Sequence, residues 1–188
     1  TIFDNAATLP NAIVTDTSNY YPINNTSSFS IDLPSHFFSW GIYAIQWKQK
    51  LDMDRDFDGG IIEFSSDSGN TWQNAFNNPY VYNFYGFDAT NKDTLINGDY
   101  AFSGTDTTWK NIWLCFDYSW IISIDNLSFR YTLKSDSVNN NREGWMIDNL
   151  ISHITLIHTV NEVKEEEYMK VGPNPTSGRI DISTKKTR

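Results

Sequence analysis

Hydrophobic and polar residues alternate along several stretches of this chain, and clusters of turn-forming residues separate these stretches. The alternation is clearest at residues 43–51, 61–64, 127–133 and 145–151. A period of two is typical of a β-strand that has one face in a core. Residues 109–116 are apolar on both faces, which predicts a central strand. Several strands without a convincing helix predict an all-β fold in which two antiparallel sheets pack as a sandwich.

The composition supports this fold class and excludes several kinds of partner. The chain has 188 residues, with seven Trp, ten Tyr and twelve Phe, and aromatic side chains favour pleated, half-buried strands. Its net charge of −9 argues against nucleic acid and anionic membrane surfaces, since both require clustered Lys and Arg. No apolar run approaches the ~20 residues of a transmembrane segment. The single cysteine, Cys115, lies in an apolar run and is interpreted as a small buried hydrophobe.

The pattern changes near the C-terminus. Residues 159–170 contain three consecutive glutamates and little apolar content, which predicts a solvated linker. Residues 171–182 have the sequence V-G-P-N-P-T-S-G-R-I-D-I. Proline fixes φ and lacks an N–H donor, so this segment predicts a stiff turn that leads into a short alternating strand.

This turn resembles the opening of the C-terminal sorting domain found in cargo of the bacterial type IX secretion system. Residues 171–188 are accordingly expected to be the truncated start of such a domain. The resemblance implies that the protein is secreted or held on the outer cell surface, with the type IX machinery as a partner. The residues that carry it are Pro173, Asn174, Pro175 and Gly178.

A second motif lies at residues 65–72, S-S-D-S-G-N-T-W. It fits the pattern S-x-D-x-G-x-T-W and resembles the Asp-box. Asp and Ser side chains are expected to accept hydrogen bonds from backbone N–H groups at a hairpin tip, Gly69 to take positive φ, and Trp72 to pack beneath. The motif occurs in enzymes and in non-enzymatic sandwiches, so it indicates a structural element and not a chemistry.

Four aspartates occupy alternate positions just before this motif. Because Asp54, Asp56 and Asp58 are followed by Gly59, the segment imitates the first half of a calcium loop. The bidentate glutamate of an EF-hand is absent, since Ser65 stands at the twelfth position. The alternatives are a structural calcium that relieves carboxylate repulsion and a solvated acidic loop. The candidate ligands in this loop are Asp52, Asp54, Asp56 and Asp58.

A wider resemblance spans residues 40–152. Its segments, in order, are Asp58–Gly60, the Asp-box, Ala101–Gly104, Trp109, Phe129–Tyr131, Ser135–Asp136 and Gly144–Asp148. Together they are similar to the MAM-like jelly-roll modules found beside secreted metallopeptidases such as immune inhibitor A. The resemblance implies a jelly roll at residues 1–158, followed by the linker and the start of the sorting domain. It also implies a structural calcium between an acidic residue near the first strand and one in the last, which here would be Asp4 and Asp148.

The search for catalytic residues is largely negative. There is no H-E-x-x-H or G-x-S-x-G motif, and His153 and His158 would lie on opposite faces of a strand. An aromatic stretch at residues 80–87 offers rings for stacking against a ligand, with strand packing as the alternative. Its candidate contact residues are Tyr80, Tyr82 and Tyr85.

These observations predict a non-catalytic binding or accessory module of a larger secreted protein, with a glycan or a surface protein as the ligand. One alternative is a carbohydrate-binding module. The other is the C-terminal accessory domain of a secreted metallopeptidase whose catalytic domain lies upstream. An H-E-x-x-H motif upstream would favour the peptidase, and ligand binding by this chain alone would favour the binding module.

Overall fold

A computed structural model describes residues 5–33, 41–78, 81–82, 93–116, 126–156, 167–172 and 181–185. Its elements are β1 (Ile13–Val14), β2 (Thr26–Leu33), β3 (Gly41–Asp52), β4 (Gly59–Ser65), β5 (Gln73–Asn74), the 3-10 helix η2 (Ala75–Asn77), β6 (Val81–Tyr82), β7 (Asp93–Thr94), β8 (Tyr100–Ala101), β9 (Thr105–Phe116), β10 (Leu127–Lys134), β11 (Gly144–Leu156), β12 (Glu167–Gly172) and β13 (Asp181–Lys185). Among the residues described, no helix has the length and apolar character needed to cross a bilayer. The predicted all-β class is confirmed.

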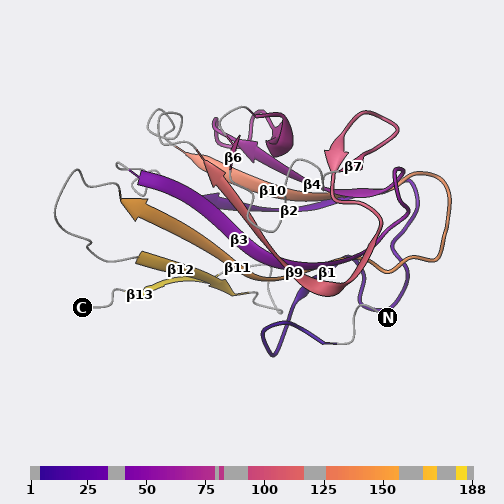
Figure 1. Cartoon of the computed structure of the whole chain (residues 1–188), viewed down its shortest axis with the longest axis horizontal. Helices are drawn as coiled ribbons and strands as arrows, with labels where there is room; N and C mark the ends of the chain where they lie inside the picture. The colour runs from indigo at the N-terminus through magenta and orange to yellow at the C-terminus, as the bar shows by residue number, and fades with distance from the viewer. Residues whose placement is uncertain are drawn as a thin grey trace.

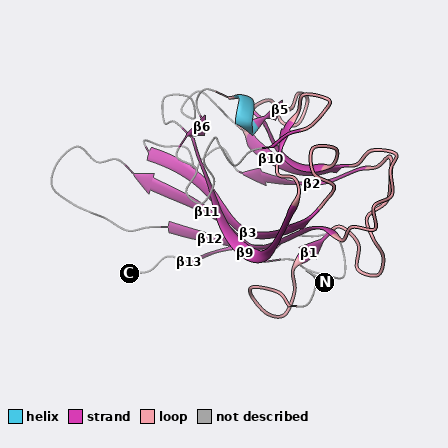
Figure 2. Cartoon of the chain, turned by 45° about the vertical axis from the view of Figure 1, so that its right-hand side comes forward, coloured by secondary structure: helices cyan, strands magenta, loops and turns pink. Residues whose placement is uncertain are grey.

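The strands form two antiparallel sheets that pack face to face (Figure 1). One sheet has seven strands, in the order β13-β12-β11-β3-β9-β6, with β1 also paired to β11. The other has four strands, in the order β2-β10-β4-β5, and β7 and β8 form a separate two-stranded ribbon. This arrangement is a jelly-roll-like β-sandwich, and β9 lies between two other strands as its apolar sequence predicts. Many of the described loops lie at one end of the sandwich, on the right in Figure 2.

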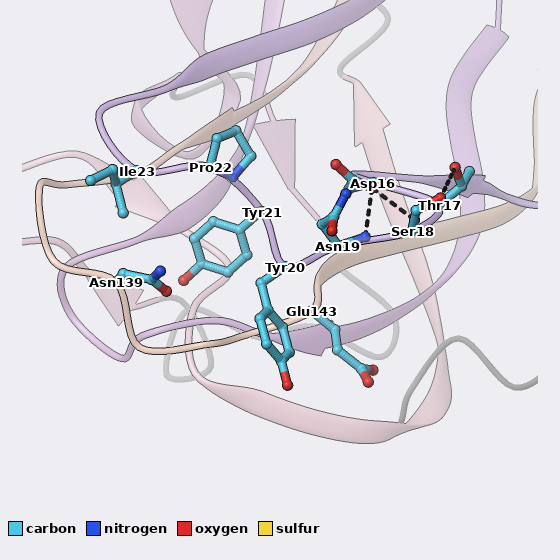
Figure 3. A pocket seen from close by; sticks show the side chains of 10 residues that line it. All are labelled: Asp16, Thr17, Ser18, Asn19, Tyr20, Tyr21, Pro22, Ile23, Asn139 and Glu143. Atoms are coloured by element: carbon cyan, nitrogen blue, oxygen red, sulfur yellow. Dashed lines mark hydrogen bonds between the residues drawn. The ribbon is translucent and has the colours of Figure 1, made fainter.

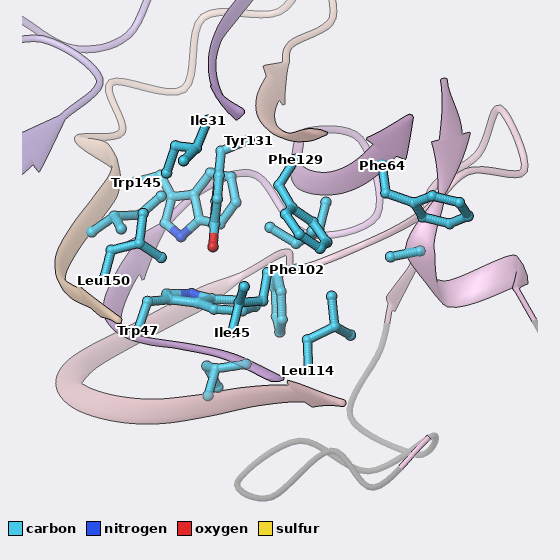
Figure 4. Close-up of a cluster of buried hydrophobic side chains, with 14 of the residues drawn as sticks. Ile31, Ile45, Trp47, Phe64, Phe102, Leu114, Phe129, Tyr131, Trp145 and Leu150 are labelled. Carbon is cyan, nitrogen blue, oxygen red and sulfur yellow. The ribbon is translucent and has the colours of Figure 1, made fainter. Parts of the chain in front are cut away.

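The core between the sheets is built from aromatic side chains (Figure 4). Trp47 of β3 and Tyr131 of β10 meet edge to face, with ring centroids 5.4 Å apart. The buried amide oxygen of Gln49 accepts hydrogen bonds from the indole N–H groups of both Trp47 (2.9 Å) and Trp145 (3.1 Å). A Cβ atom on Gly60 would lie 2.6 Å from the Trp145 ring, so glycine allows the sheets to approach closely here. This dense core fixes the strand ends from which the loops emerge.

The hairpin between β4 and β5 has the geometry expected of the Asp-box. The Asp67 carboxylate accepts hydrogen bonds from the Thr71 N–H (2.8 Å) and the Ser65 hydroxyl (2.7 Å), and these and other hydrogen bonds lower the pKa of Asp67 to about 2. Gly69 has φ +85°, and the Trp72 indole N–H donates to its carbonyl (3.0 Å). The Trp72 ring stacks against the Arg130 guanidinium, 4.2 Å from the ring centroid. The motif therefore has a structural role in this hairpin.

Strand β11 changes partner along one of its edges. Before a bulge at Asn149 (φ 51°) this edge pairs with β1, and after the bulge it pairs with β12. Strand β13 then pairs with β12, and it begins at Asp181 within the stretch predicted to be an alternating strand. Glu167–Lys170, at the end of the stretch predicted to be a linker, form the start of β12 and pair with β11.

Candidate functional site

Two loops, residues 16–25 and 135–143, meet at one end of the sandwich and form an open concavity of about 840 Å³. A third loop, residues 52–58, is hydrogen-bonded to both of them but contributes none of the described residues that line the concavity. The concavity, called here the loop-end concavity, is lined by Asp16, Thr17, Ser18, Asn19, Tyr20, Tyr21, Pro22, Ile23, Asn139 and Glu143 (Figure 3). Its size lies within the range of ~300–1,000 Å³ that is usual for small-molecule sites.

Tyr21 anchors the first of these loops to the rest of the molecule. Its N–H donates to the Arg142 carbonyl (3.2 Å), and its hydroxyl donates to Oδ2 of Asp58 (2.5 Å). The hydroxyl also accepts from the Asp54 N–H (3.2 Å). Burial and the hydrogen bond to Asp58 raise the pKa of Tyr21 above its ordinary value. Because Tyr21 is fixed inward, the neighbouring Tyr20 is directed outward and is 51% exposed.

Asp58 connects all three loops. Its carboxylate is fully buried; Oδ1 accepts from the Asp136 N–H (2.7 Å), and Oδ2 accepts from Tyr21. The Ser103 hydroxyl donates to the Asp58 carbonyl (2.7 Å). Burial raises the pKa of Asp58, while the hydrogen bonds from Tyr21 and Asp136 oppose this shift. Asp58 is therefore a structural support beneath the concavity.

Two other aspartates of the predicted calcium loop also bind donors on the loop 135–143. Asp52 accepts from Arg142 Nη1 (2.9 Å) and from the Glu143 N–H (3.0 Å), and Asp54 accepts from the Asn140 amide. Asp56 is exposed and has φ 70°. Repulsion among the carboxylates is thus offset by protein donors.

Asp148 does not join this loop. In the pairing of β3 with β11, Asp148 lies opposite Lys48 and Asp52 lies opposite Gly144. Four residues of strand, at ~3.3 Å each, place the two acids about 13 Å apart along the sheet. Asp148 is buried, and its Oδ2 accepts from the Thr8 N–H (2.6 Å).

The calcium site stays a prediction. Within the described ranges, no group of three or more His, Cys, Asp or Glu side chains could hold a metal ion. Asp4, the other acid that the resemblance implies, lies outside the described residues.

The remaining predicted site residues are only partly described. Tyr82 lies in β6, opposite Cys115 of β9. Tyr80 and Tyr85 lie outside the described residues. So do the sorting-motif residues Pro173, Asn174, Pro175 and Gly178.

Two polar side chains of the loop-end concavity are oriented by their own loops. Asp16 Oδ1 accepts from the N–H groups of Ser18 (2.8 Å) and Asn19 (2.9 Å), which lower the pKa of Asp16. Asn139 Oδ1 accepts from the Asn141 N–H (2.9 Å). Among the described residues, neither Asp16 Oδ2 nor the Asn139 amide nitrogen has a hydrogen-bond partner. The concavity therefore offers one fixed acceptor and one fixed donor.

Sequence reasoning missed this concavity. The only local signal is the turn-forming run at residues 16–19, D-T-S-N, directly before two tyrosines and a proline. Its other wall, at residues 139–143, is more than a hundred positions away in the chain. No family model matches the sequence, and no curated protein matches it.

Proposed function

We propose that this chain is a non-catalytic binding or accessory module of a larger secreted or cell-surface protein, and that the loop-end concavity is its contact surface. The observation that carries the proposal is an open concavity of about 840 Å³ into which the exposed Tyr20 and oriented polar side chains face. A concave surface with an aromatic side chain and a few oriented polar groups is the usual form of a ligand-binding site.

The two aspartates with shifted pKa values, Asp16 and Asp58, favour binding over catalysis. A general acid requires a pKa near the working pH and access to the reacting atom. Asp16 lines the concavity, but its pKa is lowered. Asp58 has a raised pKa, but its carboxylate is fully buried and engaged at both oxygens. Neither aspartate meets both requirements.

The proposal that the type IX system exports the protein rests on the sequence motif at residues 173–178. A reporter fused to the complete C-terminus of the parent protein should appear outside the cell only when the type IX machinery is intact. Equal export from cells that lack this machinery would contradict the proposal.

The contact surface can be tested by blocking it. In a Cys115→Ser background, a polyethylene glycol maleimide attached to Ser18→Cys should abolish binding to arrays of glycans and extracellular proteins. The same label on Ser30→Cys, at an exposed position of β2, is the matched control and should leave binding unchanged. If the chain binds its array ligands equally well with the Ser18 position blocked, the concavity is not the contact surface.

A further inference from the structure

We infer that the loop-end concavity binds an uncharged oligosaccharide, with one sugar ring stacked on Tyr20. This inference rests on the proposed function, since it names the ligand class of the same site. Three features of the concavity support it: the aromatic platform, the hydrogen-bonding groups around it and the charge of its lining.

Tyr20 is an exposed aromatic side chain on a loop whose backbone is hydrogen-bonded to the rest of the molecule. Tyr20 is 51% exposed, while the backbone beside it is held by the Tyr21 N–H bond to the Arg142 carbonyl and by the Tyr21 hydroxyl bond to Asp58. The C–H groups on one face of a sugar ring form an apolar patch that matches an aromatic face. Because the neighbouring residue is already fixed, binding has to order little beyond the two side-chain torsions of Tyr20.

The polar side chains that line the concavity can form hydrogen bonds with the hydroxyl groups of a sugar. A sugar hydroxyl both donates and accepts hydrogen bonds. Asp16 Oδ2 can accept from one hydroxyl, and the Asn139 amide can donate to another. The hydroxyls of Thr17 and Ser18 line the same concavity. Hydroxyl and amide groups thus outnumber carboxylates among the polar side chains of the lining.

The charge of the concavity excludes anionic sugars. None of its ten lining residues is basic, and Asp16 and Glu143 are acidic. Arg142, the basic residue nearest in sequence to this wall, binds Asp52 instead. A uronate or sulfate group would meet Asp16 and Glu143 with no basic side chain among the described lining residues, so an uncharged sugar is favoured over an anionic one.

Calorimetric titration of the full chain tests the inference. The probes are the neutral hexasaccharides of cellulose, laminarin, xylan and mannan, the anionic hexagalacturonate and the cationic glucosamine hexamer. At least one neutral probe should bind. Tyr20→Ala should weaken its binding by about tenfold, whereas Tyr20→Phe, which keeps the ring, should bind within a few fold of wild type.

The probes separate failure of the inference from failure of the proposed function. Suppose that only the anionic or only the cationic hexamer binds, and that the label at position 18 abolishes this binding. That result would overturn the neutral-sugar inference and leave the proposed binding module standing. Neutral-sugar binding that Tyr20→Ala does not change would overturn the stacking contact. If no hexamer binds, but the label at position 18 still abolishes the binding of array proteins, the sugar class is overturned and the contact surface stands.

Discussion

At the residue scale, Asp58 shows that a sequence pattern can identify an important residue without identifying its role. Four alternating aspartates predict either a cation or a solvated loop. In the folded chain Asp58 instead accepts from Tyr21 and Asp136, which come from the two loops that form the concavity. Those partners lie 37 and 78 positions away, so no local pattern could have indicated them.

Asp58→Asn should lower the free energy of unfolding by about 2 kcal/mol at neutral pH, because the amide has one acceptor oxygen where the Tyr21 hydroxyl and the Asp136 N–H both donate. The pH dependence has a definite sign. The folded-state pKa of Asp58 is raised, so the part of its stabilisation that is linked to protonation is fully present below the unfolded-state pKa and is lost as pH rises through the folded value. Wild type should therefore gain stability relative to the variant as pH falls.

Urea unfolding of both proteins at a series of pH values measures this difference. Asp56→Asn is the matched control, since Asp56 is exposed in the same loop. A wild-type advantage that shrinks in acid would contradict a raised pKa and show that the hydrogen bonds to the carboxylate dominate.

At the element scale, most of the long strands are predicted and the two-residue strands are not. Alternation over four to nine residues locates β3, β4, β10 and β11, because each has one face in the core. The eight-residue strand β2 was not predicted. Five strands are only two residues long, and two residues carry no period. The bulge at Asn149 arises where β11 exchanges β1 for β12, which only the tertiary pairing determines.

The Asp-box hairpin carries the prediction at this scale. Asp67→Ala should lower the melting temperature, since the carboxylate holds Thr71 and Ser65 across the turn. The folded-state pKa of Asp67 is depressed to about 2, so its stabilisation is present above the unfolded-state pKa and is lost as pH falls through about 2.

The melting temperatures of wild type and Asp67→Ala should therefore differ more at neutral pH than near pH 2. Ser66→Ala, at an exposed position of the same hairpin, should have little effect and serves as the control. An equal difference at both pH values would show that Asp67 does not stabilise the hairpin as a carboxylate.

At the scale of the whole molecule, the concavity exists because the sandwich brings distant loops to one end. Sequence reasoning predicted the sandwich, but it could not place residues 16–23 beside residues 139–143, because register and loop packing are set by the whole fold. The structural calcium predicted from the acidic loop would also act at this scale, since a cation bound only to the native state raises the stability of the entire domain.

EDTA should lower the melting temperature of the purified chain if this calcium is present, and added calcium should restore it. Magnesium is the control, because it requires near-ideal octahedral coordination, whereas calcium accepts a variable number of oxygen ligands. A melt that EDTA and calcium leave unchanged would remove structural calcium from the account.

The central claim is that the loop-end concavity is where this chain meets its ligand. The most direct measurement is an NMR titration of the ¹⁵N-labelled chain with the tightest-binding hexasaccharide, which maps the amide signals that shift. Saturable shifts confined to residues 16–23 and 139–143, which need about tenfold more ligand in Tyr20→Ala, are the predicted result. Saturable shifts that cluster elsewhere would contradict the claim.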